Sequence, residues 1–252
     1  MQDLTNELKH FWSKYFKFNW KFGLFLIVII CIPRFLLVLN ANQTTNYQYI
    51  GLIMTISALA PFIFLSKEGK KVIGLTKPKN HSWLFLGFIL GLGFSILLYF
   101  LGEFFYQNSF ENWYVYIAKS YNIPNEIQGK EKFVMFTIMA VTGMIFSPIG
   151  EELYFRGIIH SSFAKSLGNL KASLIESSAF SLTHISHFGL VFINNEWKFL
   201  TTPTLIWVMS MFLVSMVFYV SRKKSKSILG AILSHAGFNL GMIFCIFYLL
   251  NL

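Results

Sequence analysis

Three short polar groups interrupt an otherwise apolar chain, and their residue types could carry out hydrolysis. They are GEELYFRG at 150–157, FSLTHISH at 180–187 and SHAGFN at 234–239. Each lies in or beside a hydrophobic stretch, where an ionisable side chain costs a few kcal/mol unless it has a partner or a function. These groups are therefore the first candidates for a functional site.

The first group combines a predicted ion pair with a second carboxylate. Glu152 and Arg156 are four residues apart, which favours an ion pair on one face of a helix. Glu151 lies about 100° around the helix axis from Glu152, so we expect it to be unpaired and available for chemistry. Taken alone, the group could equally be a set of interfacial charges that reach toward water.

The other two groups supply imidazole and carboxamide side chains. His184 is predicted near the middle of a membrane span, where it is either a site residue or a buried histidine bonded to the backbone. Phe180, one turn earlier, is either a packing residue or a wall of the site. His235 and Asn239 share one helix face about two turns inside the cytoplasmic end, near the depth of Glu151.

This set of side chains is suited to peptide-bond hydrolysis. A desolvated glutamate can accept a proton from water, and a histidine can orient that water or pass the proton to the leaving amine. A second histidine and an asparagine can donate to an oxyanion. Zinc held by Glu151, His184 and His235 is the alternative, and residue types alone do not separate the two. The sequence has no GxSxG, HExxH or phosphate-loop motif, and its only aspartate is Asp3.

The elements that position these groups are predicted to be membrane helices. Of the 252 residues, 55% are apolar and 13% are charged, and the mean hydropathy is +0.56. An all-α polytopic bundle of about seven transmembrane helices follows, because lipid requires every backbone amide to be satisfied internally. The predicted spans are 22–40, 49–65, 82–105, 133–150, 172–193, 205–220 and 228–250.

Basic residues set the predicted orientation. The formal charge of +10 could suggest nucleic acid, but the lysines and arginines lie in short connections between spans, so no nucleic-acid partner is expected. The connections on one side carry 16 of the 21 Lys and Arg residues. This bias predicts a cytoplasmic N-terminus, an extracellular C-terminus and membrane lipid as the surroundings.

The chain is predicted to divide into a short lead, 1–21, and one membrane-embedded domain, 22–252. The lead suits an amphipathic helix in the cytoplasmic interface, or else a simple aromatic flank. Its apolar residues at helical spacing are Leu4, Leu8, Phe11 or Trp12, Tyr15 and Phe18. The outer loop at 106–131 is long enough to form a partly ordered cap.

The three polar groups resemble the motifs of a known family. EELYFR resembles EExxxR, FSLTH resembles FxxxH, and HAGFN resembles HxxxN of the CPBP intramembrane proteases, which include CAAX prenyl endopeptidases and bacterial Abi-type proteins. The similarity covers roughly 130–245. It implies a helical membrane fold, Glu151 as the water-activating carboxylate with Glu152 and Arg156 as support, and His184, preceded by Phe180, as its partner.

The third motif implies that His235 and Asn239 stabilise the tetrahedral intermediate, in a glutamate protease with no obligatory metal. The resulting hypothesis is an endopeptidase whose pocket opens to the cytoplasmic leaflet and which cleaves a peptide or a membrane-bound protein tail. The Phe-, Ile-, Lys- and Asn-rich composition is typical of low-GC Gram-positive bacteria, where similar members are associated with bacteriocin self-immunity, peptide maturation or scaffolding. The alternative is a non-catalytic immunity or scaffold protein whose polar residues only join helices.

Overall fold

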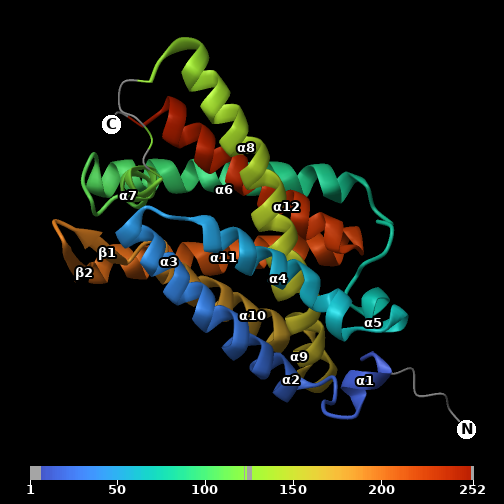
Figure 1. Ribbon diagram of the computed structural model, residues 1–252. Coiled ribbons are helices and arrows are strands. Elements are labelled where there is room, and N and C mark those ends of the chain that lie inside the picture. The colour runs from blue at the N-terminus through green and yellow to red at the C-terminus, as the bar shows by residue number, and fades with distance from the viewer. Residues whose placement is uncertain (1–6, 122, 124–126, 251–252) are drawn as a thin grey trace, which may run out of the picture.

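The computed structural model describes residues 7–121, 123 and 127–250, which form a helical bundle with one small hairpin (Figure 1). Within these residues, five helices are long and apolar enough to cross a membrane. The predicted all-α polytopic membrane bundle is confirmed. The five helices are Trp20–Thr44, Ser82–Tyr106 (α6), Gly129–Leu167, Thr201–Ser225 (α11) and Ile228–Tyr248 (α12).

Two of the seven predicted spans are shorter helices. The second is α4 (Gln48–Phe64), an apolar helix of 17 residues. The fifth is α10 (Asn169–Thr183), which has 15 residues and ends ten residues before the predicted end at 193. The chain then makes a 3-10 turn (His184–Ser186) and a hairpin, so His184 lies at the end of its helix and not in the middle. Polar residues and a glycine after Thr183 end the helix there.

The hairpin consists of β1 (Leu190–Ile193) and β2 (Glu196–Phe199), which pair antiparallel with Ile193 opposite Glu196. Its two turn residues, Asn194 and Asn195, have φ values of +54° and +64°. Asparagine tolerates this left-handed conformation, which matches the twist of a two-residue hairpin.

The lead segment is not the continuous interfacial helix that its periodicity predicts. Among its described residues, His10–Ser13 (α1) form a single helical turn, and Leu8 forms an isolated β-bridge with Leu65. The side chain of Asn19 then caps the first long helix by accepting from the backbone of Lys21 and Phe22. The predicted position Leu4 lies outside the described residues.

The long helices approach closely where small residues face each other. A Cβ atom on Gly91 of α6 would clash with the carbonyl of Ser234, and one on Gly237 of α12 would clash with the carbonyl of Phe88. In membranes, where lipid is as apolar as leucine, such small residues let helices pack through their backbones. This contact fixes α12, and therefore His235, against α6.

Two π-helical stretches lie close in sequence to Arg34 and Glu151. The first long helix runs from α2 (Trp20–Leu26) through a π-helical stretch (Ile27–Cys31) into α3 (Ile32–Thr44). The third runs from α8 (Gly129–Glu152) through another π-helical stretch (Leu153–Ile159) into α9 (His160–Leu167). Such stretches recur at functional sites, because they redirect the side chains around them.

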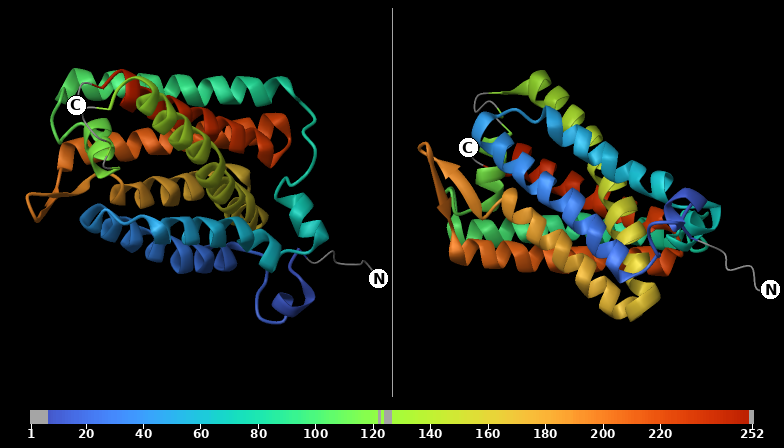
Figure 2. Two further views of the ribbon diagram at one scale, coloured as in Figure 1. Left: turned by 45° about the horizontal axis from the view of Figure 1, so that its top comes forward. Right: turned by 60° about the horizontal axis from the view of Figure 1, so that its bottom comes forward.

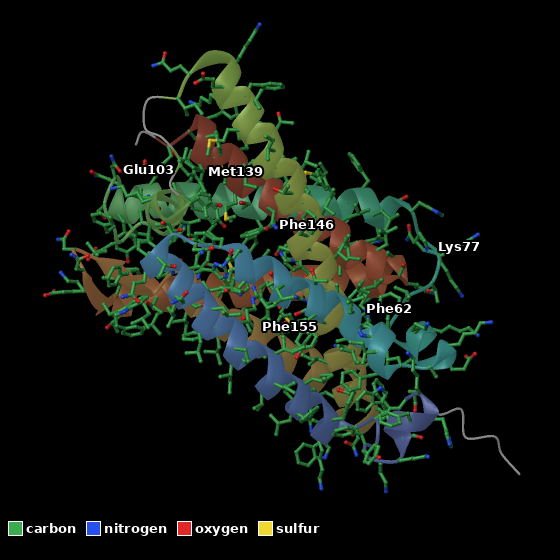
Figure 3. The ribbon with its side chains drawn as sticks, in the orientation of Figure 1. Phe62, Lys77, Glu103, Met139, Phe146 and Phe155 are labelled. Carbon is green, nitrogen blue, oxygen red and sulfur yellow. The ribbon has the colours of Figure 1, made fainter. Side chains whose placement is uncertain are left out.

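The bundle has two chemically different ends. At one end lie α5 (Lys67–Val72), the connection into α6, and the turn between α11 and α12 (Figure 2). At the other end lie the hairpin and α7 (Trp113–Ser120). The Trp113 side chain of α7 packs against the rings of Phe188 and Trp207 in the bundle. Lys77 and Glu103, in Figure 3, mark these two ends. Helix α7 therefore forms part of the cap predicted for the outer loop at 106–131.

Candidate active site

The predicted site residues converge on one cavity of about 260 Å³ inside the bundle. Its polar lining includes Glu151, His184, His235 and Asn239, which come from α8, the turn after α10, and α12. Its remaining walls are mostly apolar. Thus the structure brings together all four residues that the sequence predicts to be catalytic.

The cavity lies in the half of the bundle that faces α7, away from the basic connections. Its lining includes Ile50 near the start of α4, Ile117 and Tyr121 of the α7 segment, and Trp207 near the start of α11. Burial raises the pKa of the Tyr121 hydroxyl above its usual value, as do Tyr47 and Glu151 nearby. This lining places the cavity nearer to α7 than to the basic connections, and the expected opening to the cytoplasmic leaflet stays a prediction.

Glu151 is held by two side chains that the sequence does not suggest as partners. Arg34 Nη2 donates to Glu151 Oε1 at 2.9 Å, and both side chains are 3% exposed. Ser147, one turn earlier in α8, donates to the same oxygen at 2.6 Å. The prediction of an unpaired Glu151 is therefore wrong. An isolated buried carboxylate would be too costly, and Arg34 supplies the compensating charge from α3.

His184 faces the other oxygen of Glu151. Its Nδ1 donates to the carbonyl of Phe180 at 2.7 Å, and its Nε2 lies 3.9 Å from Glu151 Oε2. Trp207 donates to the carbonyl of His184 at 3.0 Å and holds the turn in place. Because Nδ1 carries the donated proton, Nε2 is an acceptor in the neutral ring. Two acceptors, one carboxylate oxygen and one imidazole nitrogen, thus face each other in the cavity.

Behind the cavity, Glu152 connects two helices. Arg156 Nη1 donates to Glu152 Oε1 at 3.1 Å, which confirms the predicted ion pair within the helix. His235 Nδ1 donates to the same oxygen at 2.7 Å, across from α12. Arg156 also donates to Ser215 of α11. Glu152 and Arg156 therefore position His235, which is consistent with a supporting role.

Phe180 lies between His184, which faces the cavity, and Arg156, which lies behind it. Its ring centroid lies 4.4 Å from the guanidinium carbon of Arg156 and 4.2 Å from the ring of His184. Phe218 contributes a second ring beside Arg156 and stacks on His235 at 4.7 Å. The aromatic rings exclude water from the ion pair and fix both imidazole planes.

Asn239 completes the cavity wall on α12. Its Nδ2 donates to the carbonyl of Gly143 in α8 at 2.8 Å. A carboxamide nitrogen carries two hydrogens, so the second is available to a group in the cavity. The predicted shared face of His235 and Asn239 is confirmed, since both line this cavity.

Three further residues of this region were not assigned roles from the sequence. Arg34 is the one basic residue within a predicted span, and that position was the available signal. His187 also lines the cavity, with its ring 5.2 Å from that of His184. Glu176 of α10 is fully buried between Arg156 at 3.8 Å and His160 at 3.4 Å. A glutamate in the fifth apolar run was the signal for it.

The zinc alternative can be compared with this geometry. Over the described part of the chain, no three His, Cys, Asp or Glu side chains are grouped so that they could hold a metal ion. Arg34 and Ser147 occupy Glu151 Oε1, and His235 Nδ1 is bonded to Glu152. As arranged, Glu151, His184 and His235 do not form a ligand set for zinc.

Comparison with known families agrees with the geometry. Residues 133–241 match the family described as "Type II CAAX prenyl endopeptidase Rce1-like". The matched segment contains all three polar groups, from Glu151 to Asn239. This segment is therefore similar to the CPBP intramembrane proteases. No curated protein and no solved structure matches it. Arg34 lies outside the matched segment, so a helix that precedes this segment supplies the charge that holds Glu151.

Proposed function

We propose that this protein is an intramembrane endopeptidase that hydrolyses a peptide bond in a membrane-associated protein or peptide. The supporting observation is the 3.9 Å separation between Glu151 Oε2 and His184 Nε2 inside a cavity with largely apolar walls. Both atoms are hydrogen-bond acceptors, so a water molecule can donate one hydrogen to each. Its lone pair is then free to attack a carbonyl carbon.

In the attack step, the water oxygen bonds to the carbonyl carbon of the substrate. One proton passes to His184 Nε2 or to Glu151 Oε2. If His184 accepts it, the Glu151 carboxylate stabilises the imidazolium, as a carboxylate does in a catalytic triad. Arg34 and Ser147 meanwhile fix the carboxylate plane through Oε1. We therefore assign Glu151 and His184 jointly to water activation.

The oxyanion that forms in this step needs donors. Asn239 has a second N–H available beside its bond to Gly143. His235 donates from Nδ1 to Glu152, which holds its ring beside Asn239 in the wall of the cavity. Collapse of the intermediate then breaks the C–N bond, and the proton held by His184 or Glu151 passes to the leaving amine nitrogen.

The apolar walls support a hydrophobic substrate segment. Met139, Met211, Phe238 and Met242 line the cavity beside the polar groups. Flexible methionine side chains adapt to different partners, so an extended apolar segment of a membrane protein or peptide suits this surface. Within the proposal, the chain resides in a cell membrane with its N-terminus in the cytoplasm, and the physiological role is peptide maturation or self-immunity against a bacteriocin.

The test is cleavage of a quenched fluorescent peptide library, with lipidated members, by detergent-purified protein. We expect wild type to cleave in the presence of a chelator, because the proposed mechanism uses only side chains. Glu151→Gln and His184→Ala should each lower kcat by about 10²–10⁴. Glu103→Gln, which removes a carboxylate at the end of α6, is the matched control and should leave cleavage unchanged.

Other outcomes would redirect the proposal. Loss of cleavage on chelation, with recovery on adding zinc, would replace the metal-free mechanism with a zinc mechanism. If folded wild type cleaves no plain or lipidated peptide, the endopeptidase proposal is overturned in favour of a non-catalytic immunity or scaffold protein. The joining of α3 to α8 by Arg34 and Glu151 is the observation that fits this second function.

A further inference from the structure

A second cavity, of about 280 Å³, lies at the basic end of the bundle, away from the active-site cavity. Its cations come from separate parts of the chain. Lys71 belongs to α5, whereas Arg222, Lys223 and Lys226 belong to the end of α11 and the turn that follows. Segments about 150 residues apart in sequence therefore bring four cationic side chains to one cavity.

No carboxylate lines this cavity among the described residues, and the buried Glu176 lies behind its wall at 3.4 Å from His160. Lys71 pairs with Glu68, but that carboxylate is exposed and outside the lining. The adjoining cavity differs, because there Lys165 pairs with Glu7 at 2.7 Å. Converging like charges repel one another, so an anion bound among them would relieve the repulsion.

The backbone holds this arrangement in place. Ile228 donates to the carbonyl of Gly74 at 2.8 Å, and Ser227 donates to the carbonyl of Thr76 at 2.7 Å. Gly74 has a φ of +88°, and a Cβ there would lie 3.2 Å from the nitrogen of Ile228. The connection after α5 is thus fixed to the turn before α12. The backbone that carries the cationic side chains is held in place by the same contacts.

The inner wall is polar and partly ordered. Arg222 Nη2 donates to Ser161 at 3.3 Å, which orients the guanidinium group. His160 Nε2 lies 3.3 Å from Asn169 Oδ1, and both side chains line the cavity. A guanidinium with lysines around it combines planar hydrogen bonding and point charges, which is the chemistry that binds phosphate oxygens.

We propose that this cavity binds a phosphate group, presented either by the headgroup of an anionic phospholipid or as a free phosphate. The cavity lies at the end where the basic connections gather. Basic residues beside a membrane span attract anionic lipids of the leaflet they face. The site is independent of the peptidase chemistry, since it lies at the other end of the bundle and shares no lining residue with the first cavity.

The test is thermal unfolding of the full chain in an uncharged detergent, with increasing short-chain phosphatidylglycerol, short-chain phosphatidylcholine or inorganic phosphate. The pocket variant is Lys223→Gln with Lys226→Gln. The matched control is Lys70→Gln with Lys224→Gln, which removes two charges from the same segments but outside the cavity lining. We expect phosphatidylglycerol to raise the Tm of wild type and control, and to bind the pocket variant about tenfold more weakly.

Each outcome decides the proposal. A Tm increase with phosphatidylglycerol but not with phosphate or phosphatidylcholine, lost only in the pocket variant, supports a lipid headgroup. A Tm increase with phosphate that is lost only in the pocket variant supports a free-phosphate site. If neither anion raises the Tm of wild type, or if both double variants lose the effect equally, the cavity is not a phosphate site and the proposal is overturned.

Discussion

The two oxygen atoms of Glu151 have different surroundings, and this difference carries the functional argument at the scale of single residues. Oε1 accepts from Arg34 and Ser147, which is what a structural ion pair between helices requires. Oε2 instead faces His184 across the cavity. A purely structural glutamate has no need of the second contact, so separating the two roles experimentally tests the proposed chemistry.

A double-variant cycle separates the structural role of Glu151 from its proposed catalytic role. Arg34→Gln leaves the Glu151 carboxylate buried without its partner and should lower the free energy of unfolding by about 3–5 kcal/mol. Adding Glu151→Gln removes both charges, and we expect the stability of the double variant to return to within about 1 kcal/mol of wild type. Its peptidase activity should stay about 10³-fold below wild type. Unfolding in mixed micelles and peptide cleavage supply the two readouts. Recovery of activity along with stability would make Glu151 a structural residue only.

Asn239 permits a second test at this scale. Asn239→Ala removes the proposed oxyanion donor, and we expect kcat to fall by about 10²–10³ with little change in KM, since the donor acts mainly on the developing charge. Asn239→Asp should be no more active, because a carboxylate repels the oxyanion. Steady-state cleavage of one library-derived peptide measures both parameters. Asn80→Ala, in the connection before α6, is the control. A change in KM alone would assign Asn239 to substrate binding.

At the scale of helices, the active-site geometry depends on how closely α8 approaches α4. Gly150 directly precedes Glu151, and a Cβ on it would lie 2.8 Å from the carbonyl of Met54. That distance is too short for a carbon contact with backbone, so any larger residue must push the two helices apart. The position of Glu151 relative to Arg34 and His184 therefore depends on this glycine.

Gly150→Ala should destabilise the protein by about 1–3 kcal/mol, the usual cost of overpacking, and should lower cleavage by displacing Glu151. Gly93→Ala is the matched control, because a Cβ on Gly93 of α6 would have nothing within 4 Å. Alanine is the better helix former, so the control should be neutral or more stable by about 0.5–1 kcal/mol. Thermal unfolding and peptide cleavage measure both effects. Equal behaviour of the two variants would show that the α4–α8 contact tolerates a methyl group.

The sequence predicts contacts within one helix better than contacts between helices. The Glu152–Arg156 pair and the shared face of His235 and Asn239 follow from helical periodicity, and both predictions are confirmed. The pair between Arg34 and Glu151 joins residues 117 positions apart, and no local pattern encodes that distance. The end of α10 was misplaced for a related reason: apolar residues of the β1 strand extended the hydrophobic run beyond Thr183.

At the scale of the whole molecule, the two cavities lie toward opposite ends of the bundle. The basic cavity is at the end with α5 and the turn before α12, whereas the active-site cavity extends toward α7. If the basic end faces the cytoplasm, as the distribution of lysine and arginine predicts, the cavity proposed for peptide cleavage lies in the outer half of the membrane. The orientation of the chain therefore decides from which side a substrate segment can enter.

Cysteine labelling in intact cells tests this orientation. Lys77→Cys places a thiol in the exposed connection after α5, and Asn195→Cys places one at the exposed tip of the hairpin. The native thiols, Cys31 and Cys245, are buried, so they give little background. A membrane-impermeant maleimide should label Asn195→Cys in intact cells, and Lys77→Cys only after permeabilisation. The reverse pattern would place the N-terminus outside and the cavity proposed for peptide cleavage in the cytoplasmic half, so that its substrates would come from the cytoplasmic leaflet.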